Sequence, residues 1–292
     1  MLSINTNAAA LVSQNSLSKT QSSLPTSMTR LGTGYRVNSA MDDAAGLQIA
    51  TRLKAQTSGM AVAQKNTQNG ISMMQTAEGV LSEVTEILQR MKDLATEAYT
   101  ASTTTDDQTA LQGEYDALGE ELANIIKNTS FGGATLFSDG TAVDGSGGKL
   151  SDAMTFQIGA SSGETMEVDL NTLVTALATA LTSSSTKYED GTAGAELSAT
   201  GTNAIIDTLS DALDAVGSLR SGLGAASNRL EHVYNNLANM STNTEQAAGR
   251  IMDVDYASET ATMTSQQILL QASTTMLKQA SSMSQMVLTL IQ

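Results

Sequence analysis

Cysteine and tryptophan are absent from this 292-residue sequence, and proline and histidine occur once each, as Pro25 and His232. Without cysteine, the chain can form no disulfide, no thiolate metal site and no cysteine nucleophile. A single histidine excludes a two-histidine metal site and an HExxH protease helix within one chain. We interpret His232 as an ordinary surface or packing residue.

Long apolar runs are also missing from the sequence. No stretch reaches the roughly 18 consecutive apolar residues of a membrane-spanning helix, so no membrane span is expected. The N-terminus lacks a charged start followed by a continuous apolar segment, so a cleaved secretory signal is not expected either.

Aromatic residues make up only 3% of the chain, whereas methionine occurs 15 times. The apolar volume therefore comes mainly from methionine, alanine and leucine, which pack as small or flexible aliphatic side chains along helices. We interpret the methionine stripes as core rather than as cofactor ligands. A single proline is compatible with long uninterrupted helices.

Charge is distributed unevenly along the chain, whose net charge is −15. Residues 1–34 contain two bases and no acid, and residues 257–292 contain one acid, Glu259, and one base, Lys278. The ends are nearly uncharged, and the stretch between them is strongly acidic. Nucleic-acid binding needs clustered lysine and arginine, so a nucleic-acid partner is not expected.

A heptad seam runs from residue 49 to residue 98. Apolar or small residues recur there at alternating steps of four and three, and only Gln56, Thr67 and Gly70 interrupt them. The spacing predicts one continuous helix. At a rise of roughly 1.5 Å per residue that helix would be about 75 Å long, which predicts a rod.

A matching seam over residues 205–254 predicts an antiparallel partner for this helix, and a third helix fills another side of the bundle. The three helices are expected at about 41–99, 105–128 and 203–253, with a capping box beginning at Thr105. We therefore expect a mainly α fold: an elongated rod of long antiparallel heptad helices, as a helical bundle or coiled coil, with a small β-hairpin region.

Period-two alternation replaces the heptads at about 153–170 and predicts the two-stranded hairpin. A short amphipathic helix is expected at 170–181. The following residues, 182–202, are rich in Ser, Thr, Gly and Ala, and predict an exposed loop at the far tip.

Seven glycines lie inside the predicted helices, and each weakens an isolated helix by roughly 0.5–1 kcal/mol relative to alanine. Either they allow a neighbouring backbone to approach closely in a lattice, or the bundle merely tolerates them, and both interpretations stay open. They are Gly59, Gly70, Gly79, Gly217, Gly222, Gly224 and Gly249.

Both ends of the chain carry thin apolar stripes on otherwise polar segments, which should become helical only against a partner. Pro25 is expected to kink or interrupt the first helix. Two antiparallel long helices would bring both tails out at one end, where they can pair with each other and with other copies. The predicted self-assembly positions are Ile4, Ala8, Leu11, Leu17, Leu24, Met28 and Leu31, and Leu269, Ala272, Met276, Met283, Met286 and Leu290.

Residues 30–46 break the stripe and predict a linker. Its two glycines permit backbone angles that other residues avoid, and Ser39 followed by two aspartates predicts a helix N-cap with acids in the first turn. The linker residues singled out are Gly32, Gly34, Asn38, Asp42 and Asp43.

No catalytic constellation is present in the sequence. The glycines at 145, 147 and 148 are not followed by the Gly-Lys-Ser/Thr element of a phosphate-binding loop. The adjacent acids Asp42 and Asp43, like Glu120 and Glu121, point about 100° apart on a helix and do not share one site. We therefore expect no enzyme, no cofactor and no metal, which leaves association as the function.

Four segments resemble bacterial flagellin, in the order in which that family carries them: SINTNAAAL at 3–11, RLGTGYRVNSAMDDAAGLQIA at 30–50, LGAASNRLEHVYNNLANM at 223–240 and GRIMDVDYASETATMTSQQIL at 249–269. The similarity is weak from about 140 to 200, where flagellins usually insert large variable outer domains. The resemblance therefore indicates a short flagellin that lacks those domains.

The resemblance implies a discontinuous coiled-coil inner domain, from 1–40 and 255–292, and a rod-like outer domain over 41–254. It implies a secreted, extracellular subunit that self-assembles into the helical filament of the bacterial flagellum for motility. It further implies type III flagellar export, a chaperone, and contacts with the cap and hook-junction proteins.

One more site comes from the resemblance. Flagellins recognised by an innate immune Toll-like receptor present a Gln-Arg-x-x-x-Leu face and a glutamate on the next helix. Here these residues match Gln89, Arg90, Leu94 and Glu114, while Lys92 and Asp93 occupy variable positions. The alternative is that this face packs against the next subunit.

Two other functions fit the same helical ends. A hook-filament junction protein shares the terminal helices but polymerises only a few subunits deep. A secreted adhesin or effector could also carry flagellin-like ends. Seeded assembly would separate these from a filament subunit, because long filaments favour flagellin.

Overall fold

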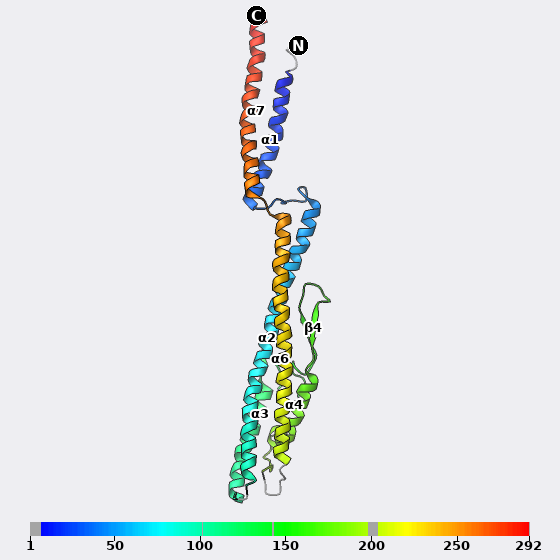
Figure 1. The fold of residues 1–292 in the computed structure, drawn as a ribbon, viewed down its shortest axis with the longest axis vertical. Coiled ribbons are helices and arrows are strands. Elements are labelled where there is room, and N and C mark those ends of the chain that lie inside the picture. The colour runs from blue at the N-terminus through cyan, green and yellow to red at the C-terminus, as the bar shows by residue number, and fades with distance from the viewer. Residues whose placement is uncertain (1–6, 101, 142, 198–203, 292) are drawn as a thin grey trace. The chain divides into compact units, whose positions relative to one another are not determined.

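The structure is a computed structural model, shown as a ribbon in Figure 1. It describes residues 7–100, 102–141, 143–197 and 204–291. For residues 190 and 283–291 it describes the backbone alone.

The chain divides by its internal contacts into two compact units. The terminal unit consists of Met1–Thr57 and Thr242–Gln292, and the central unit of Ser58–Ser241. Each unit is described by itself below.

The described residues are mainly helical, as the sequence predicts, with two small two-stranded sheets. The elements in chain order are α1 (Ala8–Thr33), α2 (Ala44–Ala98), α3 (Thr105–Asn128), β1 (Ser130–Phe131), β2 (Ala134–Thr135), β3 (Met154–Gln157), β4 (Thr165–Val168), α4 (Asn171–Ser184), α5 (Thr186–Asp190), α6 (Ala204–Met252) and α7 (Tyr256–Ile291).

The core of the central unit is the predicted seam between α2 and α6, which lie antiparallel. Seam residues of both helices are almost completely buried, because the heptad spacing keeps them on one face of each helix. Those on α2 include Met74, Leu81, Val84, Leu88 and Met91, and those on α6 include Leu209, Val216, Leu219, Leu223 and Leu230.

Helix α3 covers another side of this core and carries one of the two tyrosines buried in it. Tyr115 is fully buried, and its hydroxyl donates a hydrogen bond to the backbone carbonyl of Ser184 at the end of α4. Tyr188, on α5, is buried too, and its hydroxyl donates to the Val143 carbonyl at 3.1 Å. Burial raises the pKa of both phenols far above the ordinary value.

The predicted hairpin is confirmed. Strands β3 and β4 pair antiparallel, with Met154 opposite Val168 and Phe156 opposite Met166. Its apolar face packs on the helical core, which a lone hairpin needs in order to persist in water.

Two of the helix glycines let this hairpin region approach α2. A Cβ added at Gly59 would lie 2.7 Å from the Ala160 Cβ, and one at Gly70 would lie 2.9 Å from the Phe156 ring. The atoms that approach these two glycines belong to the same chain: Ala160 lies against Gly59, and the Phe156 ring lies against Gly70. A Cβ at Gly79, Gly217 or Gly224 would meet no atom within 4 Å among the described residues.

The segment predicted as an exposed loop, 182–202, is partly buried instead. Its residues 186–190 form α5, and Leu197 is 1% exposed. Gln112 on α3 holds the segment, because its amide oxygen accepts from the Leu197 backbone and its amide nitrogen donates to the Glu196 carboxylate. Residues 198–202 lie outside the described part of the chain.

One local prediction is corrected, and one is narrowed. The capping box of α3 begins at Thr104, not Thr105: the Thr104 hydroxyl accepts from the Asp107 amide, and the Asp107 carboxylate accepts from the Thr104 amide. Pro25 does not interrupt α1, which continues through it, and the alternative that it kinks the helix stays a prediction. Pro25 and Gln21 are both exposed, so water can donate to the Gln21 carbonyl that the proline leaves without its helical partner.

Tyr115→Phe should lower the free energy of unfolding by about 1–3 kcal/mol, because it leaves the buried Ser184 carbonyl without its donor. Chemical denaturation followed by circular dichroism measures the change. Tyr234→Phe removes a hydroxyl from a half-exposed ring on α6 and serves as the matched control. Equal effects of the two substitutions would contradict this assignment.

Candidate functional site

Helices α1 and α7 pack against each other in the terminal unit (Figure 1). Near the start of α1, the Asn7 side-chain amide donates to the Ala280 carbonyl of α7 at 2.9 Å. Near the end of α1, the Arg30 guanidinium lies 3.8 Å from the Glu259 carboxylate. The two contacts show that the helices are antiparallel, so the tails pair with each other as predicted.

The inward face of α7 is displaced by one residue from the predicted stripe. Leu270, Ser273, Leu277 and Ala280 are buried or half-buried, whereas Leu269 is 55% and Met276 63% exposed. A shift of one residue turns a helix by about 100°, so the predicted stripe lies beside the seam rather than in it. Sequence periodicity alone could not distinguish the two, because both stripes repeat every seven residues.

The predicted stripe of α1 is divided in the same way. Leu17, Leu24 and Leu31 are half-buried, whereas Leu11 and Met28 are 55% and 58% exposed. Exposed alanines continue both outer stripes, at Ala8 on α1 and Ala272 on α7. Ile4 and the side chains of Met283, Met286 and Leu290 lie outside the described residues.

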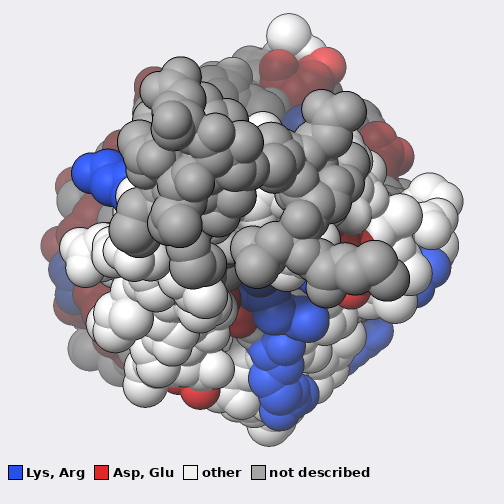
Figure 2. Space-filling view, turned by 90° about the horizontal axis from the view of Figure 1, so that it is seen from above, with Lys and Arg blue, Asp and Glu red and all other residues white. Residues whose placement is uncertain are grey.

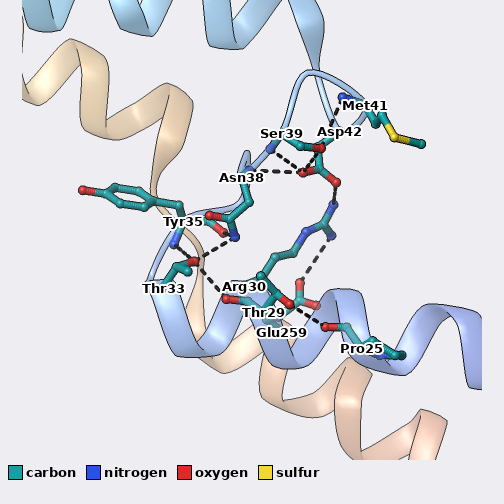
Figure 3. Close-up of polar contacts among 10 residues, drawn as sticks. All are labelled: Pro25, Thr29, Arg30, Thr33, Tyr35, Asn38, Ser39, Met41, Asp42 and Glu259. Atoms are coloured by element: carbon teal, nitrogen blue, oxygen red, sulfur yellow. Dashed lines mark hydrogen bonds and ion pairs between the residues drawn. The ribbon is translucent and has the colours of Figure 1, made fainter.

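The linker between α1 and α2 is organised around the Asp42 carboxylate (Figure 3). It accepts hydrogen bonds from the Ser39 amide at 2.9 Å and from the Asn38 amide at 3.1 Å. These amides hold the pKa of Asp42 below its ordinary value. The Asn38 side chain in turn donates to the Thr33 hydroxyl at 2.8 Å, which connects the linker to the end of α1.

Arg30 joins this carboxylate to α7. Its guanidinium lies between the carboxylates of Asp42 and Glu259, at 3.7 and 3.8 Å (Figure 3). The three side chains are only 13–29% exposed, so solvent screens the pairs less than it screens pairs on an open surface. Three residues from separate segments are thereby held together by charge.

The sequence indicated Asp42 but not its two partners. The scarcity of charge at both ends could have indicated them, because Arg30 is one of two bases in residues 1–34 and Glu259 is the only acid in residues 257–292. A lone charge in an otherwise uncharged helical segment favours an opposite charge when it is partly buried.

Only one of the two linker glycines needs an unusual conformation. Gly34 ends α1 with φ of 76°, and a Cβ there would lie 2.9 Å from the Tyr256 hydroxyl. Gly32 lies within α1, where a Cβ would meet no atom within 4 Å among the described residues.

The N-cap prediction for α2 is corrected from Ser39 to Asp43. The Asp43 carboxylate accepts from the Gly46 amide at 2.8 Å, one turn into the helix. Ser39 lies earlier in the linker and donates to Asp42. A carboxylate can cap a helix as well as a hydroxyl can, so the choice between neighbouring candidates depends on the path of the linker.

The linker also pairs with the turn between α6 and α7. The Arg36 amide donates to the Met252 carbonyl, and the Val254 amide donates to the Gly34 carbonyl at 3.0 Å. Val37, between these contacts and α2, is 1% exposed. The linker is therefore a folded part of the terminal unit.

The candidate receptor face lies in the central unit, on α2 and α3. Arg90 and Glu114 pair through hydrogen bonds of 2.6 and 2.9 Å, which raise the pKa of the guanidinium. Gln89 is exposed beside them. Leu94 is 1% exposed and lies in the core, so it is not part of the free surface.

No described helix is long and apolar enough to cross a membrane. Within the described residues, no three His, Cys, Asp or Glu side chains are grouped in a way that could hold a metal ion.

Comparison with known proteins identifies the family. Residues 4–142 match the bacterial flagellin N-terminal helical region, and residues 206–291 match the bacterial flagellin C-terminal helical region. The chain belongs to the bacterial flagellin family. It is a structural, non-enzymatic subunit of the extracellular flagellar filament.

Similarity to other flagellins extends over the whole chain. This chain is 35% identical to polar flagellin F of Vibrio parahaemolyticus, with 99% of each chain covered. It is 36% identical to flagellin of Bacillus subtilis, again with 99% of each covered, and 41% identical to flagellin of Halalkalibacterium halodurans, with 91% of this chain and 90% of that protein covered. This favours the filament subunit over the junction protein and the adhesin considered from the sequence.

Asp42→Ala should release the linker, because the amides of Asn38 and Ser39 lose their acceptor. Their hydrogen exchange, measured by NMR on the flagellin monomer, should become about tenfold faster or more. Asp106→Ala, at an exposed first-turn position of α3, is the matched control.

Acid should loosen the native linker as the Asp42→Ala substitution does, because protonation of Asp42 weakens the same hydrogen bonds. The folded-state pKa of Asp42 is lowered, so its contribution to stability is present above the ordinary carboxyl pKa and is lost as pH falls through the lowered value. The Asn38 and Ser39 amide shifts should move together over that range. Independent shifts would contradict the shared acceptor.

Proposed function

We propose that the outer stripes of α1 and α7 are the surfaces through which flagellin copies assemble. The supporting observation is the exposure of Leu11, Met28, Leu269 and Met276 on two helices whose inner faces are already paired. Large exposed apolar side chains favour burial against another surface, at about 25 cal/mol per Å² removed from water. The almost uncharged ends add little desolvation cost to that burial.

We also propose a division of roles along the chain. Residues 1–40 and 255–292 act as the inner domain that assembles, and residues 41–254 act as the outer domain. Membership of the flagellin family also favours further partners: the type III export machinery, a chaperone, the cap and the hook-junction proteins.

The face formed by Gln89, Arg90 and Glu114 is proposed to bind a Toll-like receptor. Arg90 and Glu114 are already paired, so a receptor would meet a preformed arrangement of charge. Leu94 acts from below this face, where it fixes α2 in the core.

Leu269→Asp and Met276→Asp should each abolish filament growth or raise the critical concentration at least about tenfold, because each places a charge on a stripe that becomes buried. Pelleting of polymer from seeded monomer gives the critical concentration. Gln271→Asp adds the same charge on the opposite side of α7 and should assemble normally. Normal assembly of both stripe variants would rule out this surface.

Arg90→Ala should raise the monomer concentration that gives half-maximal receptor signalling about tenfold, as expected for an arginine at the centre of an interface. A reporter-cell dose response measures this. Arg229→Ala removes an exposed arginine from α6 and is the matched control. An unchanged dose response for Arg90→Ala would reject the receptor assignment.

A further inference from the structure

Two outward faces of the terminal unit carry opposite charge and belong to neither the paired stripes nor the linker. The first is on the initial turns of α2, where Ala44, Leu47, Gln48, Thr51, Arg52 and Ala55 line a shallow groove. These residues recur at steps of three and four, so they share one side of the helix. Gly46 and Ala50 are buried on its other side.

The second face is on the last turns of α6. Glu245, Gly249 and Arg250 line it at helical spacing, and Asp253, directly after the helix, lines it too. Residues on the other side of this segment, including Ala247, Ala248 and Ile251, are half-buried. Each face therefore points away from the packed side of its own helix.

The charges of the two faces are complementary. Arg52 is the one charged residue that lines the first face, whereas three acids, Glu245, Asp253 and Asp255, and one base, Arg250, line the second. Arg52 and Glu245 are exposed, and among the described residues neither makes an ion pair or a side-chain hydrogen bond. In Figure 2, some of the Lys and Arg side chains in view form a band below the centre, and others lie apart from it.

We propose that the α2 face of one flagellin copy docks on the α6 face of a second copy, with Arg52 opposite Glu245. The inference rests on the proposed assembly, and it names a second contact besides the apolar stripes. Two different, complementary faces on one chain make a heterologous contact, which repeats from copy to copy without closing. That is the symmetry an open filament requires, and a self-complementary face would stop at a dimer.

The test is a charge-reversal cycle on full-length flagellin, read as the critical concentration for seeded polymerisation. Arg52→Glu and Glu245→Arg should each raise it about fivefold at low salt, because attraction becomes repulsion. The double variant should return to within about twofold of the native value. At 1 M salt, where the Debye length is about 3 Å, the single variants should approach the native value.

Two controls locate the effect. Arg229→Glu makes the same charge change at another exposed position of α6 and should assemble as the native chain does. The melting temperature of each monomer is measured as well. If the two substitutions are coupled in polymerisation but not in monomer melting, the contact lies between copies. If they are equally coupled in both measurements, the pair lies within one copy, which overturns the proposal.

The remaining outcomes also separate the hypotheses. Single variants that polymerise like the native chain overturn the docking contact and leave the apolar stripes standing, as would be found if the basic face served another anionic partner. A double variant as defective as the worse single variant overturns it too. Failure of the native chain to polymerise would instead reject the proposed assembly.

Discussion

Burial of a continuous aliphatic seam between α2 and α6 is the interaction on which the central unit depends. Leu81, Leu88, Leu219 and Leu223 have no exposed surface, and each fully buried leucine contributes roughly 1.5–3 kcal/mol. With so few aromatic residues, no single side chain can anchor the unit. Stability therefore comes from repetition of the seam, which requires the helices to be long.

Local contacts explain two of the residues that interrupt the apolar repeat of the seam, Thr67 and Gly70. Thr67 is fully buried in α2, and its hydroxyl donates to the Ala63 carbonyl one turn earlier at 2.7 Å, so the polar group is satisfied. Gly70 lacks a side chain where the Phe156 ring of the hairpin lies against the helix. The seam is interrupted where a third element packs, and the glycine allows that packing.

Sequence periodicity predicted the parts of the fold that a repeat determines: the long helices, their antiparallel packing and the hairpin. It could not choose between neighbouring stripes on α7, because Leu269 and Leu270 both begin a heptad repeat. It also missed the buried segment around Tyr188 and Leu197, since two apolar residues among Ser, Thr and Gly make no periodic signal. Their burial depends on α3, whose Gln112 side chain binds the segment.

Sequence periodicity gave no indication of the Arg30 cluster either. A pair between residues 229 positions apart leaves no local pattern, although the scarcity of charge at both ends made these two residues unusual. The scarcity of charged residues at both ends of the chain also has a physical consequence. Because the few charges near the linker are used within the chain, the paired helices beyond it present mainly polar neutral and apolar side chains outward. Such a surface can be buried against identical copies without bringing like charges together, which the acidic residues of the central unit would prevent.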